Sequence, residues 1–127
     1  MPPWKSYKGI ICDLNGCHTS EIQQQNEYWI DQAIIKKDVA LCNNSLGFGF
    51  QNKAKEQSVY ECKSEYAVGI GDLEYCSSLD KEVQYVNCRQ KYAIKYRKPE
   101  ICEGISTSGD ENDRLSIIKA CKKEAVK

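Results

Sequence analysis

The sequence is short of the residues and motifs by which an enzyme is normally recognised. It has a single histidine, His18, and contains no Gly-x-Ser-x-Gly, His-Glu-x-x-His, phosphate-loop or dinucleotide-binding pattern. No two cysteines are separated by two residues, as they are in many zinc sites, and the acidic residues are too scattered to nominate a catalytic pair. We therefore expect a protein without enzymatic activity and without a metal or other cofactor.

The chain also lacks an excess of charge and a long apolar run. Eighteen Lys and Arg residues balance eighteen Asp and Glu residues, so we expect no nucleic-acid partner. No apolar run approaches the roughly 18 residues of a membrane span, so we expect no membrane insertion within this chain. The segment after Met1 has no basic and then apolar signal pattern. We interpret the chain as a mature protein or an excised ectodomain with an added initiator methionine.

Cysteine, in contrast, is abundant. Eight cysteines occur in 127 residues, a density that is rare where thiols are kept reduced and common in secreted or periplasmic domains. The even count allows every thiol to pair. We therefore expect an extracytoplasmic protein, whether secreted, periplasmic or on the cell surface. The length suits a single domain over residues 1–127.

The cysteines belong to an internal repeat. In three segments an alanine lies nine residues before a cysteine, and an apolar residue directly precedes that cysteine. A second cysteine follows each segment, within surroundings that also recur. The segments run from Ala33 to Cys42, Ala67 to Cys76 and Ala93 to Cys102, and the second cysteines are Cys62, Cys88 and Cys121. We predict a repeating unit of a short helical segment, a variable loop and a longer helix.

Apolar residues with a period near 3.6 predict the helices. Within 52–70 they form one stripe, made by Val59, Cys62, Tyr66, Ala67 and Ile70. Ser20 with Gln23 predicts a capping box, Asp72 and Asp80 are predicted N-caps, and Gly71 is a predicted C-cap. The predicted helices span 21–37, 52–70, 73–79, 81–97, 99–105 and 114–127, with Pro99 in a first turn and a polar loop over 106–113.

Two pairing schemes fit this pattern. If each short helix is bonded to the longer helix after it, no cysteine of the repeat is left over; the pairs are then Cys42–Cys62, Cys76–Cys88 and Cys102–Cys121. If each long helix bonds to the next short one, Cys42 and Cys121 have no partner, so we adopt the first scheme.

The predicted fold is all-α, with disulfide-linked helical-hairpin repeats in a short α-solenoid-like array. An N-terminal turn segment (1–20) and a first helix (21–37) precede cysteine-paired units at 38–66, 72–92 and 98–125.

The last unit carries a family resemblance. Its motif is Tyr92-Ala93-Ile94, then Lys98-Pro99-Glu100-Ile101-Cys102-Glu103-Gly104-Ile105, Asp113 and Cys121. This motif resembles the cysteine-paired helical repeats of uncharacterised secreted or membrane-anchored archaeal proteins. The resemblance covers roughly residues 28–127 and implies a repeat architecture and a surface location, but no activity.

One string near the N-terminus has two interpretations. Cys12-Asp13-Leu14-Asn15-Gly16-Cys17-His18 is a C-x₄-C-H variant of the attachment site of c-type haem, in which Cys12 and Cys17 would hold the porphyrin and His18 the iron. Alternatively, Asn15-Gly16 forms a tight turn closed by a Cys12–Cys17 disulfide. We favour the disulfide because the chain has no obvious second axial ligand.

Leu46, Phe48 and Phe50 form the best candidate binding surface. They lie in a glycine-containing stretch within the longer loop of the first unit, where they would serve either as a recognition loop or as a cover for the end of the helices. Trp4, Tyr7 and Trp29 present the same alternatives, and we expect them in a cap or the core.

The repeat, the dense disulfides and the missing catalytic motifs favour a non-enzymatic protein-binding or structural module with an unknown protein partner. The alternatives are a single-haem electron-transfer protein and a small secreted inhibitor or effector that uses the 46–50 loop.

Overall fold

The computed structural model describes residues 2–47, 52–79 and 81–127. The chain is mostly helical and contains four disulfides, as predicted. The chain consists of two compact units, Met1–Tyr66 (unit 1) and Ala67–Lys127 (unit 2), and the single domain expected over 1–127 stays a prediction. Two disulfides lie in each unit, and each joins cysteines no more than 20 residues apart. These short covalent loops favour contacts between segments that are close in the sequence.

Unit 1 begins with a short 3-10 helix and a β-hairpin, which precede a long α-helix. Its elements are η1 (Pro3–Ser6), β1 (Ile10–Asp13), β2 (Gly16–Thr19), α1 (Glu21–Lys36), η2 (Val39–Asn44) and most of α2 (Asn52–Ile70), which continues into unit 2. The Ser20 hydroxyl accepts a hydrogen bond from the Gln23 backbone N–H at 3.3 Å, which confirms Ser20 as the N-cap of α1; the reciprocal bond of a capping box is absent, because the Ser20 N–H donates to the Gly9 carbonyl. The bond from Gln23 satisfies one of the amides left unpaired in a first helical turn.

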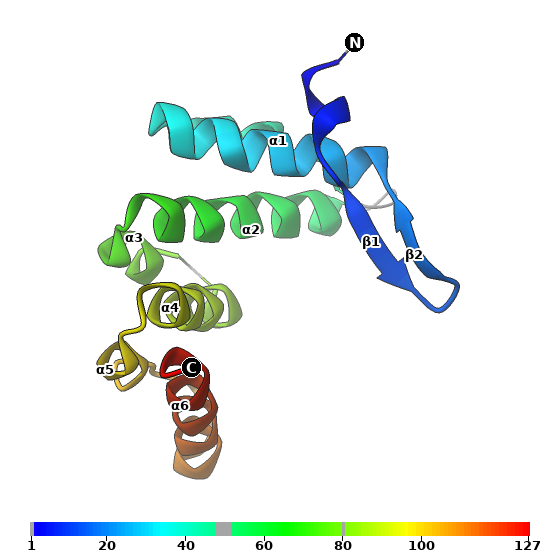
Figure 1. Ribbon diagram of the computed structural model, residues 1–127. Coiled ribbons are helices and arrows are strands. Elements are labelled where there is room, and N and C mark those ends of the chain that lie inside the picture. Colours follow the sequence, from blue (N-terminus) through cyan, green and yellow to red (C-terminus); the bar gives the residue numbers. More distant parts are fainter. Residues whose placement is uncertain (1, 48–51, 80) are drawn as a thin grey trace. The chain divides into compact units, whose positions relative to one another are not determined.

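The N-terminal turn segment is a two-stranded antiparallel sheet. β1 and β2 extend together beyond the end of α1 (Figure 1), and Cys12 lies opposite Cys17. The connection between the strands consists of Leu14 and Asn15, because Asp13 pairs with Gly16. The Asp13 carboxylate accepts a hydrogen bond from the Asn15 N–H at 2.8 Å, and Gly16 has a φ of 104°, which favours glycine.

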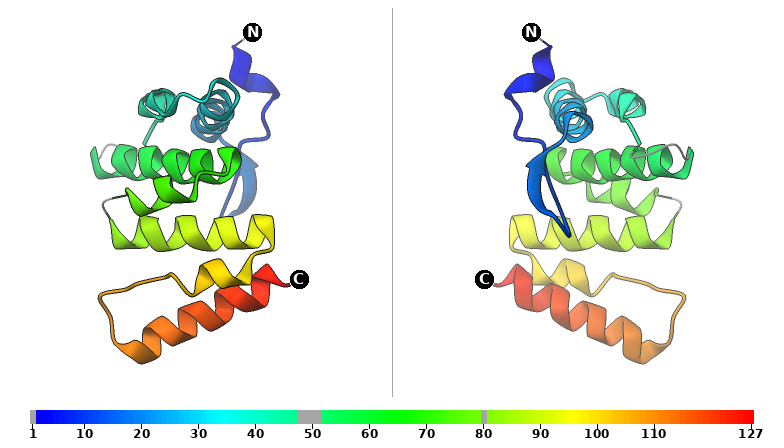
Figure 2. Two further views of the ribbon diagram at one scale, coloured as in Figure 1. Left: turned by 90° about the vertical axis from the view of Figure 1, so that its left-hand side faces the viewer. Right: turned by 90° about the vertical axis from the view of Figure 1, so that its right-hand side faces the viewer.

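Unit 2 contains two long helices and two short ones. They are α3 (Leu73–Ser77), α4 (Glu82–Tyr96), α5 (Pro99–Cys102) and α6 (Glu111–Ala125). α4 and α6 run in the same direction because the segment after α5 returns to the starting end of α4 (Figure 2). A buried cluster joins α4, α5 and α6; it consists of Val86, Ala93, Cys102, Ile105, Ile118, Cys121 and Ala125.

Several helix boundaries in unit 2 differ from those predicted. α6 begins at Glu111 instead of residue 114, because the Asp110 carboxylate accepts a hydrogen bond from the Asp113 N–H at 2.8 Å and caps the helix. α3 and α5 end at Ser77 and Cys102, before the predicted ends at 79 and 105. Asp80, the predicted cap of α4, lies outside the described residues; the residue preceding the helix is Lys81, whose side chain makes no capping hydrogen bond.

The helices that precede the short segments end in the same way. In α1, α2 and α4 a fully buried alanine accepts a hydrogen bond from the backbone N–H five residues later, across a residue with positive φ. The alanine, the positive-φ residue and the donor are Ala33, Lys37 and Asp38 in α1, Ala67, Gly71 and Asp72 in α2, and Ala93, Arg97 and Lys98 in α4. This left-handed C-terminal cap reverses the chain into the short helix that carries the next cysteine.

The four disulfides join the pairs that the repeat and the turn predict. The inter-helix bonds are Cys42–Cys62, Cys76–Cys88 and Cys102–Cys121, with Cα–Cα distances of 5.5, 5.4 and 5.8 Å. Each of these six cysteines is at most 2% exposed, so the bonds form much of the core. The fourth bond, Cys12–Cys17, crosses the exposed hairpin.

Candidate functional site

The predicted binding stretch at 46–50 is only partly within the described residues. Leu46 is half-buried, and its backbone is tied to α1 by two hydrogen bonds with the buried Asn26 side chain. The Leu46 N–H donates to Asn26 Oδ1 at 2.7 Å, and Asn26 Nδ2 donates to the Leu46 carbonyl at 2.9 Å. Phe48 and Phe50 lie outside the described residues. The role of this stretch in recognition therefore stays a prediction.

The hairpin contains the residues of the haem alternative. The Cys12 and Cys17 sulfurs are bonded to each other across the two strands, with a Cα–Cα distance of 4.0 Å. Thioether bonds to a haem would need both sulfurs, so the disulfide and the haem site exclude one another. His18 is about half exposed, and its Nδ1 lies 3.9 Å from Asp13 Oδ2.

The base of the hairpin is fixed to α1 at Gly9. The Gly9 N–H donates to Glu27 Oε2 at 2.9 Å, and its carbonyl accepts from the Ser20 N–H at 2.7 Å. Gly9 has a φ of 55°, and a Cβ at this position would lie 2.2 Å from Gln24 Cγ and 2.8 Å from the Ser20 carbonyl oxygen. Only glycine permits this close approach, which sets the direction in which the hairpin leaves the helix.

The N-terminal aromatic residues pack on α1 beside this base. Tyr28 is in edge-to-face contact with Trp4, Tyr7 and Trp29, at centroid distances of 6.4, 5.9 and 4.9 Å. The Tyr7 hydroxyl donates a hydrogen bond to Asp31. This bond, with partial burial and the carboxylate's charge, raises the pKa of Tyr7 to about 12. Trp4, Tyr7 and Trp29 are thus packing residues, as expected.

Beyond its base, the hairpin is exposed on both faces. All residues of β1 and β2 are exposed except Ile11, which is half-buried, and Ile10 is 53% exposed. Leu14, at the apex, is fully exposed. A two-stranded hairpin is only marginally stable by itself in water, so the cross-strand disulfide and the anchored base hold this projection in one conformation. The apex therefore presents an apolar side chain on a rigid support.

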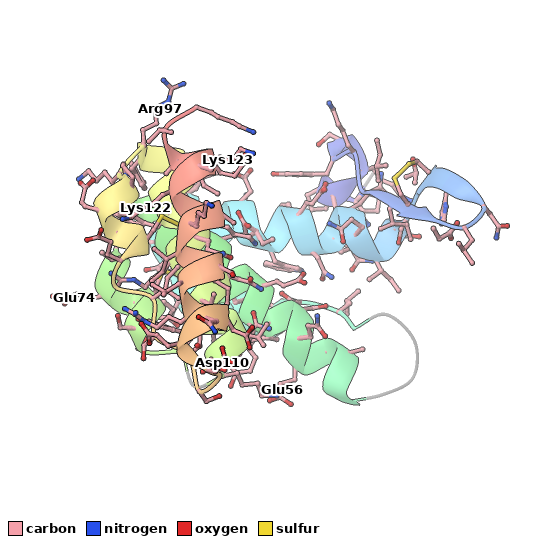
Figure 3. All side chains as sticks on the ribbon, turned by 90° about the horizontal axis from the view of Figure 1, so that it is seen from below. Glu56, Glu74, Arg97, Asp110, Lys122 and Lys123 are labelled. Atoms are coloured by element: carbon pink, nitrogen blue, oxygen red, sulfur yellow. A yellow bond between two sulfur atoms is a disulfide. The ribbon has the colours of Figure 1, made fainter. Side chains whose placement is uncertain are left out.

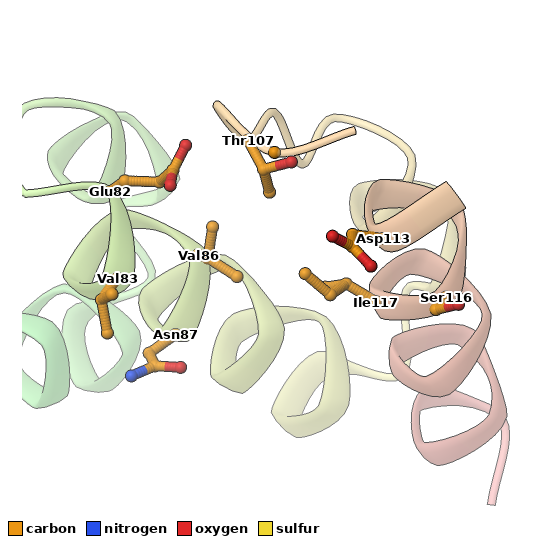
Figure 4. Close-up of a pocket in the computed structure, with 9 residues that line it drawn as sticks. Glu82, Val83, Val86, Asn87, Thr107, Asp113, Ser116 and Ile117 are labelled. Atoms are coloured by element: carbon orange, nitrogen blue, oxygen red, sulfur yellow. The ribbon is translucent and has the colours of Figure 1, made fainter. Parts of the chain in front are cut away.

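Unit 2 contains a second candidate site, a groove of about 490 Å³ between α4, α6 and the connection before α6 (Figure 4). Its apolar lining comes from both helices, with Val86 buried and Ile117 half-buried. The lining residues are Glu82, Val83, Val86, Asn87, Thr107, Gly109, Asp113, Ser116 and Ile117. Asp113 and Ile117 point from α6 toward Val86 on α4 (Figure 4).

The groove carries negative charge. Glu82 and Asp113 line it, and no Lys or Arg is among its lining residues. Glu82 Oε1 accepts from the Ser108 N–H and Oε2 accepts from the Ser108 hydroxyl at 3.0 Å, which fastens the connection to α4. Arg114, next to Asp113 in the sequence, directs its guanidinium elsewhere: it donates to the Ile105 carbonyl at 2.9 Å.

A buried hydroxyl also lines the groove. Thr107 Oγ1 is inaccessible to solvent and has no hydrogen-bond partner among the described residues. Most buried hydroxyls in proteins are hydrogen-bonded, and an unpaired one carries a desolvation cost of about 1–3 kcal/mol.

Sequence reasoning did not find this groove. Its residues come from 82–87 and from 107–117, which are 20 positions apart at their nearest, and each segment by itself has an ordinary pattern. Glu82 and Asp113 are typical of first helical turns, where carboxylates favour the positive end of the helix dipole. A long polar connection between two parallel helices would have been the only indication.

Within the described residues, no group of three or more His, Cys, Asp or Glu side chains is placed to hold a metal ion. Over the same part of the chain, every helix is too short or too polar to cross a membrane. Comparisons of the chain with protein-family models, curated proteins and solved structures found no match.

Proposed function

We propose that this chain is an extracytoplasmic, non-enzymatic protein-binding module whose recognition element is the hairpin β1–β2. The observation that carries this proposal is the exposed Leu14 apex on a disulfide-closed hairpin. A leucine that stays in water gains nothing from folding, whereas burial against a partner contributes about 1.5–3 kcal/mol, or at least tenfold in affinity.

The pairing of all eight cysteines supports the proposal that the protein works in an oxidising compartment. The three inter-helix disulfides close loops of 12 to 20 residues. Chain entropy assigns each of them about 3 kcal/mol, comparable in total to the whole stability of a domain. A chain with this dependence belongs where disulfides persist, such as a cell surface, a periplasm or a secreted fraction.

Preorganisation supports binding by the hairpin. The base is fixed through Gly9 and Glu27, and the apex through Cys12–Cys17, so the loop loses little conformational entropy when it meets a partner. The exposed strands also offer unpaired backbone groups beside the apex. A narrow projection of this kind fits a concave apolar site on the partner.

This shape also favours a second candidate function, that of a small secreted inhibitor or effector. An inhibitor of this kind would insert Leu14 into an enzyme's cleft, so binding should lower the activity of the partner. A structural partner would bind the same apex without a change in activity.

The cysteine-paired segments 38–66, 72–92 and 98–125 are proposed to form a short array of helical repeats. The recurring cap after a buried alanine in α1, α2 and α4 supports this proposal. A compact 127-residue domain has a radius of gyration of about 14 Å. Small-angle scattering should give a clearly larger value for an array, and a value of 14 Å would contradict it.

Site-specific crosslinking tests the recognition element. A photoreactive residue in place of Leu14 should form one major adduct with the surface fraction of the producing cells, and an excess of unlabelled wild-type chain should prevent it. Ile35 on α1, which is 64% exposed, is the matched position and should give no such adduct.

Two competitors complete the crosslinking experiment. The Leu14→Asp chain should compete at least tenfold less well than wild type, and the Ile35→Asp chain should compete as well as wild type. Equal competition by the two variants, or equal adducts from the two positions, would show that the apex is not the recognition element.

A further inference from the structure

The groove of unit 2 has a shape and charge that the proposed hairpin function does not use. Its floor is apolar, with Val86 from α4 and Ile117 from α6, and Thr107 lies on the connection beside them. About 490 Å³ is enough for one or two amino-acid side chains and lies within the range of sites that bind small molecules. The same groove is also lined by two carboxylates, those of Glu82 and Asp113.

Two carboxylates give the groove its charge. Among the described residues, no Lys or Arg lies within ion-pair distance of Glu82 or Asp113. Figure 3 shows Arg97 and Lys123 away from Asp110, which caps the helix that carries Asp113, and the nearer Arg114 pairs with Glu111 outside the groove. Among the described residues, none therefore supplies a cation to this groove.

Helix capping accounts for part of the acidic character but not for all of it. Asp110 already caps α6, and the Asp113 carboxylate makes no hydrogen bond among the described residues. Glu82 accepts hydrogen bonds from Ser108 through both carboxylate oxygens, and neither bond comes from a cation. Asp113 in particular has a charge that faces the groove and serves no other contact.

We propose that this groove binds a cationic group on an apolar stem, namely the side chain of a lysine or arginine in a partner polypeptide. The stem packs against Val86 and Ile117, and the charged head lies between Glu82 and Asp113. Burial of the stem supplies the affinity, and the carboxylates supply the selectivity for positive charge. The proposal is independent of the hairpin, which lies in unit 1.

The expected affinity for a single residue is low. Ion pairs with exposed carboxylates contribute little, so a capped amino acid should bind with a Kd on the order of 1 mM. A rise in salt from about 20 to about 200 mM should weaken binding further, because screening acts on exposed charges.

Amide chemical shifts in the full-length chain provide the test. The probes are N-acetyl-arginine amide and N-acetyl-lysine amide, and the neutral control is N-acetyl-citrulline amide, which has the shape of arginine without its charge. Both cations should shift the amides of residues 82–87, 107–109 and 113–117, and at the same concentration citrulline, which keeps only the contacts of the stem, should shift them clearly less. The absence of these shifts, or equal shifts with citrulline, would overturn the proposal.

Paired variants separate the groove from general attraction to acidic residues. Asp113→Asn should weaken binding of the arginine probe about threefold, whereas Glu111→Gln, two residues earlier on the same helix and outside the groove, should leave it unchanged. Ser116→Lys places a cation at the rim and should abolish binding, which keeps the test decisive if Asp113→Asn does not fold. Equal losses in Asp113→Asn and Glu111→Gln would overturn the site.

A final probe distinguishes the source of the cation. Butylguanidine carries a single guanidinium on an aliphatic stem, as arginine does, but has no peptide backbone. Binding of butylguanidine tenfold tighter than N-acetyl-arginine amide would overturn the assignment to a polypeptide and indicate a small cation as ligand. Equal or weaker binding of butylguanidine supports the assignment to a partner side chain.

Discussion

Replacement of Gly71 by alanine tests the cap geometry of the helices without disturbing their packing. Gly71 ends α2 with a φ of 77°, in the left-handed region. A Cβ built at this position would have the Tyr96 hydroxyl oxygen as its nearest neighbour, at 3.4 Å, which is an ordinary van der Waals contact. The substitution therefore adds backbone strain and almost nothing else.

The expected loss is about 1 kcal/mol in the free energy of unfolding. A left-handed conformation costs an L-residue about 1–2 kcal/mol relative to glycine, and alanine recovers about 0.4–1 kcal/mol because it restricts the unfolded chain. For a chain of this length, 1 kcal/mol corresponds to a fall of about 4 °C in Tm. Urea denaturation followed by circular dichroism at 222 nm measures this loss directly.

Arg97 provides the matched control at the end of α4. Its φ is already 52° with a side chain present, so Arg97→Ala keeps the strain and removes only a cation near a helix C-terminus. That loss amounts to about 0.3–1 kcal/mol. Arg97→Gly also removes the strain, and it should be more stable than Arg97→Ala by about 1 kcal/mol.

Two results would refute this reasoning. A neutral Gly71→Ala variant would mean that α2 does not end in a left-handed residue. Equal stability of Arg97→Ala and Arg97→Gly would mean that α4 does not end in a left-handed residue either. The helices would then not share a common type of C-terminal cap.

Three further predictions concern the core and the N-terminal packing. Reduction of the disulfides should unfold the chain, because each inter-helix bond contributes about 3 kcal/mol, and a reduced sample with full helical circular dichroism and a cooperative melt would contradict this. Asn26→Ala should lower the free energy of unfolding in urea by about 2–3 kcal/mol, because it leaves the Leu46 N–H and carbonyl without partners. Asn26→Asp should cost at least as much, because it buries a carboxylate oxygen against that carbonyl, and a loss below about 1 kcal/mol in either variant would count against the paired hydrogen bonds. The raised pKa of Tyr7 means that the stability contributed by its hydrogen bond is complete below pH 10 and is lost as the pH rises through about 12. The phenolate absorbance of the wild-type chain should therefore include one titration near pH 12, which Tyr7→Phe should lack and Asp31→Asn should shift toward pH 10. An unchanged titration in Asp31→Asn would disprove the hydrogen bond.

The repeat made the inter-helix disulfides predictable because each bond connects neighbouring segments. An alanine nine residues before a cysteine marks where a helix ends and how soon the next begins, as from Ala67 to Cys76. Capping residues have equally local signals: Ser20 and Asp72 accept the hydrogen bonds expected of them. Such features depend on a few consecutive residues, and a sequence displays them directly.

Two of the three positive-φ residues that end these helices could not be predicted from the local sequence. Glycine marks the end of α2 at Gly71, but α1 and α4 end at Lys37 and Arg97, which were predicted as helical residues. Neither residue type favours the left-handed region. The common geometry was recognised from the hydrogen bonds to Ala33 and Ala93.

The sequence by itself determined the helical character, the four cysteine pairs and the turn that Cys12 and Cys17 close. These features follow from helical period, capping chemistry and short loop closure, all of which act over about 20 residues or fewer. Only the tertiary structure decided that the base of the hairpin is fixed to α1 at Gly9, and that Glu82 and Asp113 line the same groove. Such arrangements depend on the directions in which distant segments return, and no periodicity along the chain records those directions.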